Sequence, residues 1–510
     1  MTPRAAWVAR SVLAFALGAI SVAGFAPFHL FALPILTLAF LFLLWEESAS
    51  ARSAAWLGFV FGLGFFLTGT SWIYISLHTF GGMPALITAV ATFLFCCVVS
   101  SYGALAGFVS KWIGARVKPP AAAPLRLLLV MPACWTLGEM MRGNLLTGFP
   151  WLGLGYSQVA ESPLAGYAAL LGSYGVSWVA AICAGALTLM LGRLEHQGAR
   201  ALALPAAVIA IVVIAGAALR AVPFTKPEGG PVKVALLQGN VAQERKFSPE
   251  VLPLIFEQYK TMVKRTDAPL IILPETAFPI FLHQLEPEYL ASIAEHAAAK
   301  GGDIVFGIAI ADVTARAYYN AVISAGASAP QMYRKQHLVP FGEYLPLRWI
   351  FAWVLEVMQI PMADFDPGPR RPPPIAVAGQ RLAVSICYED AFGSEMREQL
   401  PSATALVNVS NDAWFGKSLA AEQHWQIAQM RALESGRMML RANNTGITGI
   451  IGADGRTISR LPGFTADLLT GELQGRSGAT PYVRWGDWPV AVFLLAMLAA
   501  IAGIGSRQRV

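Results

Sequence analysis

The chain has 510 residues, of which 55% are hydrophobic and only 13% are charged, and its mean hydropathy is +0.54. Soluble domains carry about 25% charged residues, so this composition excludes an ordinary soluble protein and predicts a membrane protein. The net charge of +6 could indicate nucleic-acid binding, but no basic run or aromatic-basic motif accompanies it. We therefore predict no nucleic-acid partner and attribute the positive charge to orientation in a membrane.

The first 222 residues consist of apolar runs of membrane-spanning length, which is roughly 20 residues. Seven predicted spans lie here and an eighth follows the polar part of the chain: 8–27, 31–45, 54–77, 84–110, 125–141, 163–191, 201–222 and 488–504. The second run is short, and the fifth contains Pro132 and Glu139. Arg4 and Arg10 before the first run could mark a signal peptide, but the further spans favour a retained helix.

Basic residues gather in alternate connections between these spans. Those on one side, if the chain crosses about eight times, are Arg52, Lys111, Arg116, Lys118, Arg126, Arg193, Arg200, Arg507 and Arg509. The opposite connections contain only Arg142. The positive-inside rule assigns the basic side to the cytoplasm. It therefore predicts a multi-pass protein of the bacterial inner membrane whose polar part lies in the periplasm.

The polar part, residues 231–475, alternates predicted strands with predicted helices. The strands are short, apolar and often bounded by Gly, Pro or Asn: 232–237, 270–273, 303–308, 321–324, 382–386, 405–409 and 448–451. The helices cover 250–264, 287–300, 392–400 and 420–435. This alternation predicts a layered α/β domain, preceded by a helical membrane domain over 1–222 and followed by the closing span.

Three predicted strands end in residues that suit acyl transfer, namely Glu275, Lys335 and Cys387. They provide a base, a cation and a soft nucleophile, which are the groups needed to form and resolve a thioester. Each also has an ordinary interpretation when taken alone. Cys387 could be a small buried side chain, Glu275 a helix cap and Lys335 a surface charge.

The other four cysteines lie in or beside apolar runs, so the sequence predicts no disulfide within the polar domain and no zinc motif.

Four motifs in a fixed order are more specific than any one residue. They are a Leu-Pro-Glu-Thr strand end, a Tyr-Arg-Lys strand followed by Leu-Val-Pro-Phe-Gly-Glu, an Ile-Cys-Tyr-Glu-Asp strand end, and Asn-Asp-Ala-Trp-Phe. In this order they resemble the nitrilase superfamily over the whole of residues 231–475. With the spans before and after that domain, the chain resembles the membrane-bound branch of the superfamily, the apolipoprotein N-acyltransferases.

The resemblance implies an α-β-β-α sandwich with Cys387 as nucleophile, Glu275 as general base and Lys335 as stabiliser of the oxyanion. Residue chemistry agrees, because a nearby ammonium favours a thiolate and a carboxylate can carry the thiol proton to the leaving group. Lys335 and backbone N–H groups can meet the oxyanion. Glu343 matches the accessory glutamate of the family. It could orient Lys335 or shuttle protons with Glu275, and the sequence leaves both roles open.

The resemblance also assigns residues near the nucleophile, or in the matching loop, to the substrate pocket: Tyr388, Glu389, Trp414 and Phe415. Buried packing is an equal alternative for the aromatic side chains. Residues 344–362 are unusually apolar and include Trp349 and Trp353. This stretch is either an ordinary packed helix or an arm that enters the bilayer, where tryptophan at the interface is typical.

The implied reaction moves an acyl chain from a phospholipid, phosphatidylethanolamine, to the α-amine of the N-terminal diacylglyceryl-cysteine of an apolipoprotein. The route is ping-pong through a thioester on Cys387, and no metal or organic cofactor is implied. One alternative is a membrane-anchored amidase or nitrilase for a small soluble amide, against which the apolar arm and the helical part argue. Another is a non-enzymatic membrane scaffold with a degenerate fold, against which the intact Glu275, Lys335 and Cys387 argue.

Overall fold

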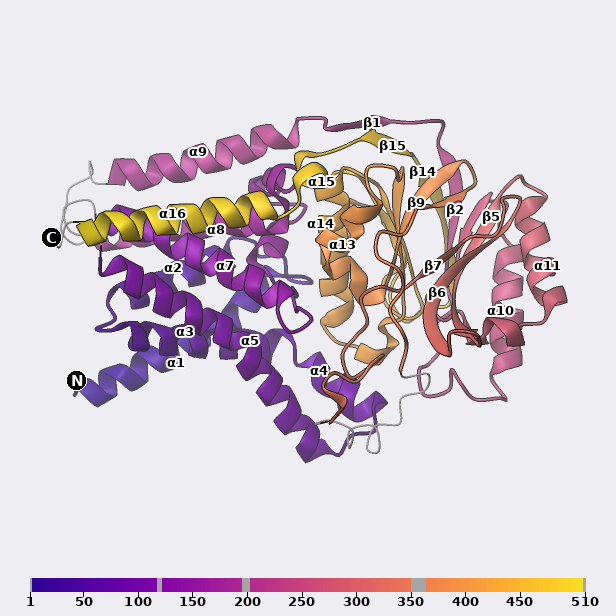
Figure 1. The fold of residues 1–510 in the computed structure, drawn as a ribbon, viewed down its shortest axis with the longest axis horizontal. Helices are drawn as coiled ribbons and strands as arrows, with labels where there is room; N and C mark the ends of the chain where they lie inside the picture. Colours follow the sequence, from indigo (N-terminus) through magenta and orange to yellow (C-terminus); the bar gives the residue numbers. More distant parts are fainter. Residues whose placement is uncertain (1, 117–121, 195–201, 350–363, 508–510) are drawn as a thin grey trace. The chain divides into compact units, whose positions relative to one another are not determined.

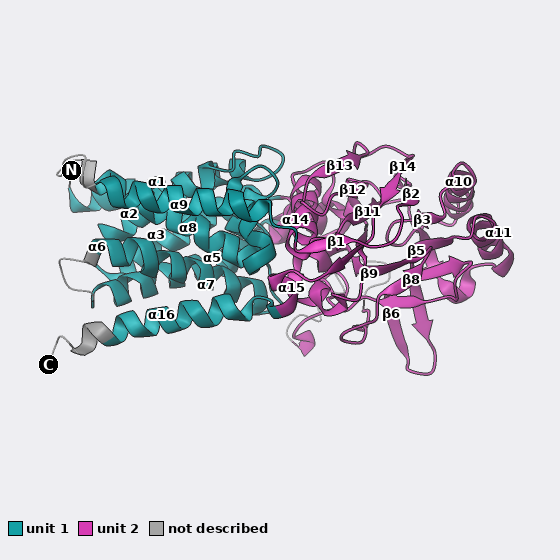
Figure 2. Ribbon diagram, turned by 90° about the horizontal axis from the view of Figure 1, so that it is seen from above, with its two compact units in different colours: residues 1–71, 89–223, 485–510 teal, residues 72–88, 224–484 magenta. Residues whose placement is uncertain are grey.

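The computed structural model describes residues 2–116, 122–194, 202–349 and 364–507. The chain divides into two compact units, coloured separately in Figure 2. Unit 1 contains residues 1–71, 89–223 and 485–510, and unit 2 contains residues 72–88 and 224–484. Unit 1 is helical, whereas unit 2 contains every strand among the described residues.

The main helices of unit 1 run through the indigo, violet, magenta and yellow parts of the chain in Figure 1. They are α1 (Pro3–Ser21), α2 (Leu33–Glu46), α3 (Ala51–Gly69), α5 (Ala85–Gly114), α7 (Met131–Asn144), α8 (Ala168–Leu194), α9 (Ala203–Arg220) and α16 (Trp488–Arg507). Small residues allow these helices to approach closely, as is typical of membrane bundles. A Cβ atom on Gly58 of α3 would lie only 2.3 Å from the carbonyl oxygen of Gly103 in α5.

Five stretches of unit 1 are long and apolar enough to cross a membrane: Pro3–Gly24, Ala51–Gly69, Ala85–Gly114, Pro163–Gly192 and Ala203–Arg220. Helix α2 and the part Trp488–Gly503 of α16 are apolar but shorter. Helix α7 is not among the candidates within the described chain. The helical membrane part is thus confirmed, whereas the count of eight spans stays a prediction.

The predicted third span, 54–77, extends too far. Helix α3 ends at Gly69, and the short helix α4 (Trp72–Ile75) and a π-helical turn (Ser76–Phe80) follow as parts of unit 2. The apolar pattern continues beyond α3 because these side chains pack on unit 2 itself. The indole Nε1 of Trp72, for example, donates to Gln423 Oε1 at 3.2 Å.

Unit 2 is built on two sheets. In the described residues, one sheet has the order β14-β2-β3-β5-β6-β7, with β4 beside β5, and the other has the order β13-β12-β11-β10-β9-β8. The first comprises β14 (Asp467–Leu473), β2 (Val232–Gln238), β3 (Leu270–Ile272), β4 (Phe278–Phe281), β5 (Asp303–Asp312), β6 (Ala317–Gly326) and β7 (Met332–Arg334). The second comprises β13 (Thr457–Arg460), β12 (Gly449–Ile451), β11 (Met439–Asn443), β10 (Ala405–Ser410), β9 (Gln380–Ile386) and β8 (Ile375–Val377). A separate pair joins β1 (Thr225–Pro227) to β15 (Arg476–Gly478).

The two sheets pack face to face, with helices on their outer faces. Leu236 and Val384 belong to one buried cluster that joins the inner faces of both sheets. The other face of the first sheet packs on α10 (Leu252–Lys264) and α11 (Pro287–Ala298), and that of the second packs on α14 (Ala420–Ser435). Figure 2 shows α10 and α11 on one side of the strands and α14 on the other. The α-β-β-α sandwich is therefore confirmed.

The central strands explain why polar residues converge at one edge. Strands β2, β3 and β5 are mutually parallel, and so are β9, β10 and β11. Both faces of these strands are buried, which is why β3 and the central part of β2 are continuous apolar runs rather than alternating ones. The carboxyl ends of neighbouring parallel strands meet at the same sheet edge, so residues that follow them lie close together.

Candidate active site

Cys387 lies directly after β9, at the first position of the 3₁₀ turn Cys387–Ala391. Its φ is 53°, a left-handed conformation that costs a non-glycine residue about 1–3 kcal/mol. The thiol is free, and the residue is buried. Val409 of β10 pairs with Ile386 of β9, so the thiol is presented where both strands end.

Glu275 lies three residues beyond β3, in a turn that packs against β5. A Cβ atom on Gly307 would lie 2.6 Å from the Cα atom of Glu275, so only glycine permits this close approach. The backbone N–H of Ala277 donates to the Gly307 carbonyl at 3.0 Å and fixes the turn. The Glu275 carboxylate is thereby held in a buried position, with the residue 7% exposed.

Lys335 follows β7 directly, and its backbone N–H donates to the Asn320 carbonyl at 2.8 Å. Its side chain is buried. The ammonium Nζ donates to Glu343 Oε1 at 2.8 Å and lies 3.7 Å from Glu275 Oε1. The cation therefore faces both of the predicted carboxylates.

Asn320 of β6 joins the same group, although the sequence did not indicate it. Its Nδ2 donates to Glu275 Oε1 at 2.8 Å and to Glu343 Oε1 at 3.0 Å. The second oxygen of Glu343 accepts from the Val339 backbone N–H at 2.8 Å. Two adjacent carboxylates repel each other, and the Lys335 ammonium together with the Asn320 amide offsets that repulsion.

The electrostatics of the site favour the protonated form of the Cys387 thiol. Burial raises the pKa of the Cys387 thiol well above its usual range, Glu275 raises it further, and Lys335 opposes both. This direction is opposite to the thiolate expected from the nearby ammonium, because burial and the carboxylates together outweigh one cation. Burial also disfavours the Lys335 ammonium, but Glu343 and Glu275 outweigh it and raise the pKa of Lys335. Lys335 therefore stays charged.

Glu389 was predicted to lie in the substrate pocket. In the structure it is buried between the segment that follows Lys335 and the end of the strand that precedes Cys387. Its Oε1 accepts from the backbone N–H groups of Gln336 at 2.6 Å and His337 at 3.0 Å. Its Oε2 accepts from the Ile386 N–H at 2.7 Å and the Tyr333 hydroxyl at 2.9 Å. Burial raises the pKa of Glu389 to about 7, against the effect of the nearby ammonium and the backbone donors. Glu389 thus ties the cysteine-bearing strand to the lysine-bearing segment.

The predicted aromatic pocket residues lie in contact with other rings. Phe415 packs edge-on against Trp72, with ring centroids 4.7 Å apart, and Trp414 lies 6.4 Å from Phe80. The half-buried Tyr388 packs edge-on against Phe392 at 5.0 Å. The segment 72–88 therefore contributes to the aromatic surroundings of the loop that carries Trp414 and Phe415.

Only the start of the predicted arm is described. Trp349 is 82% exposed, which is unusual for a tryptophan outside an interface. Trp353 falls within residues 350–363, which lie outside the described residues.

Several polar residues that the sequence analysis did not single out lie around this site. Lys246 is buried, and its Nζ donates to the Glu275 carbonyl at 3.4 Å; burial lowers the pKa of Lys246 to about 8, although Glu275 opposes this effect. Asn408 and His424 both contact the carbonyl oxygen of Cys387. No local pattern distinguishes these residues, because their partners are distant in the sequence. Within the described ranges, no cluster of His, Cys, Asp and Glu suits a metal ion.

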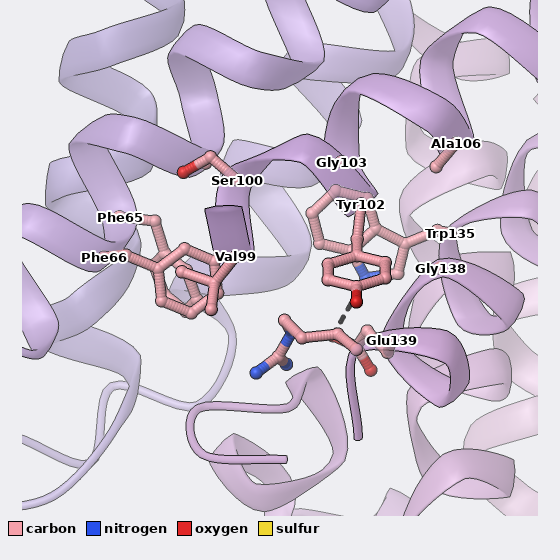
Figure 3. A pocket seen from close by; sticks show the side chains of 12 residues that line it. Phe65, Phe66, Val99, Ser100, Tyr102, Gly103, Ala106, Trp135, Gly138 and Glu139 are labelled. Atoms are coloured by element: carbon pink, nitrogen blue, oxygen red, sulfur yellow. Dashed lines mark hydrogen bonds between the residues drawn. The ribbon is translucent and has the colours of Figure 1, made fainter. Parts of the chain in front are cut away.

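A small cavity in unit 1 is shown in Figure 3, with Glu139 and Trp135 among its lining residues. Its volume is about 30 Å³, which accommodates about two water molecules and not an acyl chain. Glu139 Oε1 accepts from Trp135 Nε1 at 3.2 Å and from the Leu154 N–H at 2.9 Å. Arg142 donates to the Trp151 carbonyl at 2.7 Å. These polar groups therefore fasten the loop after α7 to that helix.

Known proteins resemble the chain along almost its whole length. Residues 17–186 match the family model for the apolipoprotein N-acyltransferase N-terminal domain, and residues 233–482 match the carbon-nitrogen hydrolase model. The apolipoprotein N-acyltransferase of Nitrosomonas europaea is 44% identical over 503 residues, covering 98% of this chain and 99% of that protein. The enzyme of the same name from Methylococcus capsulatus is 44% identical over 486 residues, covering 95% and 93%. Among solved structures, Nit3 of Saccharomyces cerevisiae is 18% identical with a TM-score of 0.37, covering 54% of this chain and 96% of that one.

Proposed function

Because the chain belongs to the apolipoprotein N-acyltransferase family, we propose that it moves an acyl chain from a phospholipid to the α-amine of a diacylglyceryl-cysteine. The acceptor is the N-terminus of an apolipoprotein, and the donor is phosphatidylethanolamine. The observation that carries this proposal is the buried group in which the Lys335 ammonium faces Glu275 and Glu343, since the charges of all three residues act on the Cys387 thiol.

In the first half-reaction, Cys387 Sγ attacks the carbonyl carbon of the phospholipid ester. The thiol is protonated at rest, so Glu275 accepts the S–H proton as the new bond forms. The tetrahedral intermediate then expels the glycerol oxygen, which takes the proton from Glu275 and leaves as lysophospholipid. The acyl chain remains on Cys387 as a thioester.

In the second half-reaction, the free α-amine of the apolipoprotein attacks the thioester carbonyl. Glu275 accepts a proton from the attacking nitrogen and returns it to the Cys387 sulfur as the thioester breaks. The product is an amide, and the thiol is regenerated. No step requires an oxidant, a reductant or a cofactor.

Lys335 stabilises the negative charge on the carbonyl oxygen in both half-reactions. Its raised pKa suits this role, because a permanent ammonium donates hydrogen bonds without giving up its proton. Of the two roles open for Glu343, the contacts support orientation of Lys335. Both oxygens of Glu343 are engaged with Lys335, Asn320 and the Val339 N–H, so Glu343 holds the ammonium rather than moving protons.

The aromatic loop at Trp414 and Phe415 provides an apolar wall suited to an acyl chain. Tyr388 follows the nucleophile and, with Phe392, offers a second aromatic surface beside it. For Glu389, whose oxygens already accept hydrogen bonds from the protein, the contacts favour positioning of the Lys335 segment over direct contact with substrate.

The catalytic unit lies on the periplasmic side of the inner membrane in this proposal. Support comes from basic residues that gather with acidic partners near one set of helix ends in unit 1. Arg126 pairs with Glu46, Lys111 Nζ donates to the Glu46 carbonyl at 2.7 Å, and Arg10 pairs with Glu47 at 2.9 Å. These are the ends that the positive-inside rule assigns to the cytoplasm. A reporter active only outside the cytoplasm should function after residue 230 and fail after Arg116.

The test of the proposed function is intact-mass measurement of the purified protein after incubation with phospholipid alone. One acyl mass should appear, hydroxylamine should remove it, and a diacylated peptide with a free N-terminus should also remove it. Cys387→Ser should bear no hydroxylamine-sensitive adduct. An N-blocked peptide serves as the matched control for the acceptor, and phosphatidylglycerol serves as the matched control for the donor headgroup.

A wild-type protein that hydrolyses small amides but never carries an acyl mass would instead support the membrane-anchored amidase. A protein whose Cys387 resists every thiol reagent and acquires no adduct would support a scaffold without catalysis.

A further inference from the structure

The carbonyl group of Cys387 is held by two side chains that take no part in the proposed proton transfers. Asn408 Nδ2 donates to its oxygen at 3.0 Å, and His424 Nε2 lies 3.2 Å from the same atom. Cys387 has a φ of 53°, a conformation that persists in a non-glycine residue only when its surroundings fix it. These two contacts fix the peptide unit that carries the nucleophile.

His424 is itself held by two carboxylates. Its Nε2 lies 2.9 Å from Asp390 Oδ1, and its Nδ1 lies 2.9 Å from Asp412 Oδ1. Because each ring nitrogen faces a carboxylate oxygen, both nitrogens carry hydrogen and the ring is an imidazolium. Burial and Arg441 disfavour this cation, but the two carboxylates outweigh them and raise the pKa of His424 to about 9.

Arg441 of β11 completes the arrangement. It donates to Asp390 Oδ2 at 2.8 Å, and a second nitrogen lies 3.4 Å from Asp412 Oδ2. It also donates to Asn408 Oδ1 at 2.9 Å, which turns the Nδ2 group of that amide toward the Cys387 carbonyl. Two carboxylates thus meet two cations, an arrangement that makes buried charge tolerable.

The five side chains come from five separate segments of unit 2, and none is more than 2% exposed. We call this group the carbonyl cradle: Asn408, His424, Asp390, Asp412 and Arg441. Asp412 also begins the turn that carries Trp414 and Phe415. The cradle therefore contacts both the nucleophile's peptide and the start of the aromatic loop.

We propose that the carbonyl cradle is a set of positioning residues that holds the Cys387 peptide in the orientation from which the thiol attacks the phospholipid ester. This inference rests on the proposed function and concerns the same thiol. The cradle acts on the reaction through the backbone of Cys387 and exchanges no proton with the substrate. A cradle that positions affects the rate of acylation, whereas a cradle that only stabilises the fold affects the amount of folded protein.

The experiment compares His424→Gln with the double variant Asp390→Asn/His424→Gln. In the single variant, Asp390 and Asp412 both remain charged and only the Arg441 cation faces them. In the double variant, one carboxylate, that of Asp412, faces the one remaining cation, that of Arg441. We expect the single variant to unfold at a lower temperature and to acylate Cys387 from phospholipid at least 100-fold more slowly. The double variant should recover most of the unfolding temperature but remain at least 30-fold slow, with the loss in kcat and not in KM. Alkylation of Cys387 by iodoacetamide should change less than threefold in both.

Glu434→Gln is the matched control. Glu434 pairs with Arg431 at 3.2 Å on the same helix α14, and both residues are buried. Its loss should lower the unfolding temperature and leave the acylation rate of the folded protein unchanged. Asn408→Ala, which removes one donor to the Cys387 carbonyl without altering charge, should slow acylation about tenfold and provides the test if His424→Gln does not fold.

Recovery of rate together with stability in the double variant would overturn the inference, as would wild-type kcat in both His424→Gln and Asn408→Ala. Absence of any acyl adduct on the wild-type protein would overturn the proposed function and this inference with it. A wild-type adduct that forms equally fast in His424→Gln would overturn this inference alone.

Discussion

Two groups of charged side chains lie near Cys387, and they differ in whether the number of cations equals the number of carboxylates. The group at Lys335 sets one ammonium against the carboxylates of Glu275 and Glu343. The carbonyl cradle sets the Arg441 and His424 cations against Asp390 and Asp412. The first group has an excess carboxylate that can accept a proton, whereas every charge of the second is matched. We therefore propose that the group with unmatched charge takes part in the reaction, whereas the group with matched charge positions Cys387.

Removing the cation or the base from the unmatched group should have the largest effect. Lys335→Met leaves Glu343 without its ammonium partner and removes the proposed donor to the oxyanion, and loss of one such donor typically costs about 2.7–4 kcal/mol. We expect Lys335→Met and Glu275→Gln each to slow thioester formation at least 100-fold, measured by quenched-flow mass spectrometry. Lys233→Met, at a lysine on the amino-terminal part of β2, is the control and should leave the rate unchanged. Near-normal turnover by folded Lys335→Met would remove it from the oxyanion role.

Asn320 offers a sharper test of charge in the same group. Its amide donates to both carboxylates, so Asn320→Ala removes two hydrogen bonds and Asn320→Asp also adds a third negative charge. We expect the alanine variant to be about tenfold slower in acylation and the aspartate variant slower again by a further factor of about ten. Equal rates in the two variants would show that repulsion between carboxylates does not limit this site.

Sequence patterns were most informative where an apolar strand ends in a polar residue. Cys387 and Glu275 were predicted to follow strands because the largely apolar runs 382–386 and 270–273 precede them, whereas Lys335 was predicted from the Tyr-Arg-Lys motif. Helix α14, Ala420–Ser435, was predicted with the same bounds that the structure shows. Local pattern and tertiary burial agree in the strands, so the sequence suffices there, whereas α14 is buried although many of its residues are polar.

The carbonyl cradle shows why the rest escaped prediction. Strand β11 was not predicted because Arg441 and Asn443 interrupt its apolar pattern, yet both residues are fully buried. They are buried because Asp390 and Asp412, distant in the sequence, supply their partners. His424 was equally inconspicuous in α14, a helix rich in polar residues. Long-range pairing of charge leaves no periodic signal, so only the structure reveals it.

Titration of His424 in the carbonyl cradle should affect how the stability of the protein depends on pH. The pKa of His424 rises from 6.5 to about 9 on folding, so its contribution to stability is fully present below pH 6.5. That contribution is lost as the pH rises through about 9, with a total on the order of 3 kcal/mol. We expect the unfolding temperature of the wild-type protein in detergent to fall between pH 6.5 and 9.

Asp390→Asn/His424→Gln keeps the charges matched without a titrating imidazolium, so its unfolding temperature should change much less over the same interval. An equal slope in both proteins would show that another group dominates the pH dependence. His296→Gln serves as a control, since His296 contacts the Thr266 carbonyl at 2.8 Å in unit 2 but lies outside the cradle.

The smallest effect is expected at Trp349, which lies outside both charged groups. Its side chain is 82% exposed, so Trp349→Ser should alter the free energy of unfolding by no more than about 0.5 kcal/mol. If the segment that begins there enters the bilayer, this substitution removes apolar contact with lipid. Acylation from phospholipid vesicles should then slow several-fold while iodoacetamide still alkylates Cys387 at the wild-type rate.

Ile458→Ser, at a residue of β13 that is 60% exposed, is the matched control and should leave both rates unchanged. Fluorescence quenching by brominated lipid, compared between the wild-type protein and Trp349→Phe, measures the contact directly. Equal quenching and equal acylation rates would show that the segment makes no contact with lipid, and the donor would then have to reach Cys387 by another route.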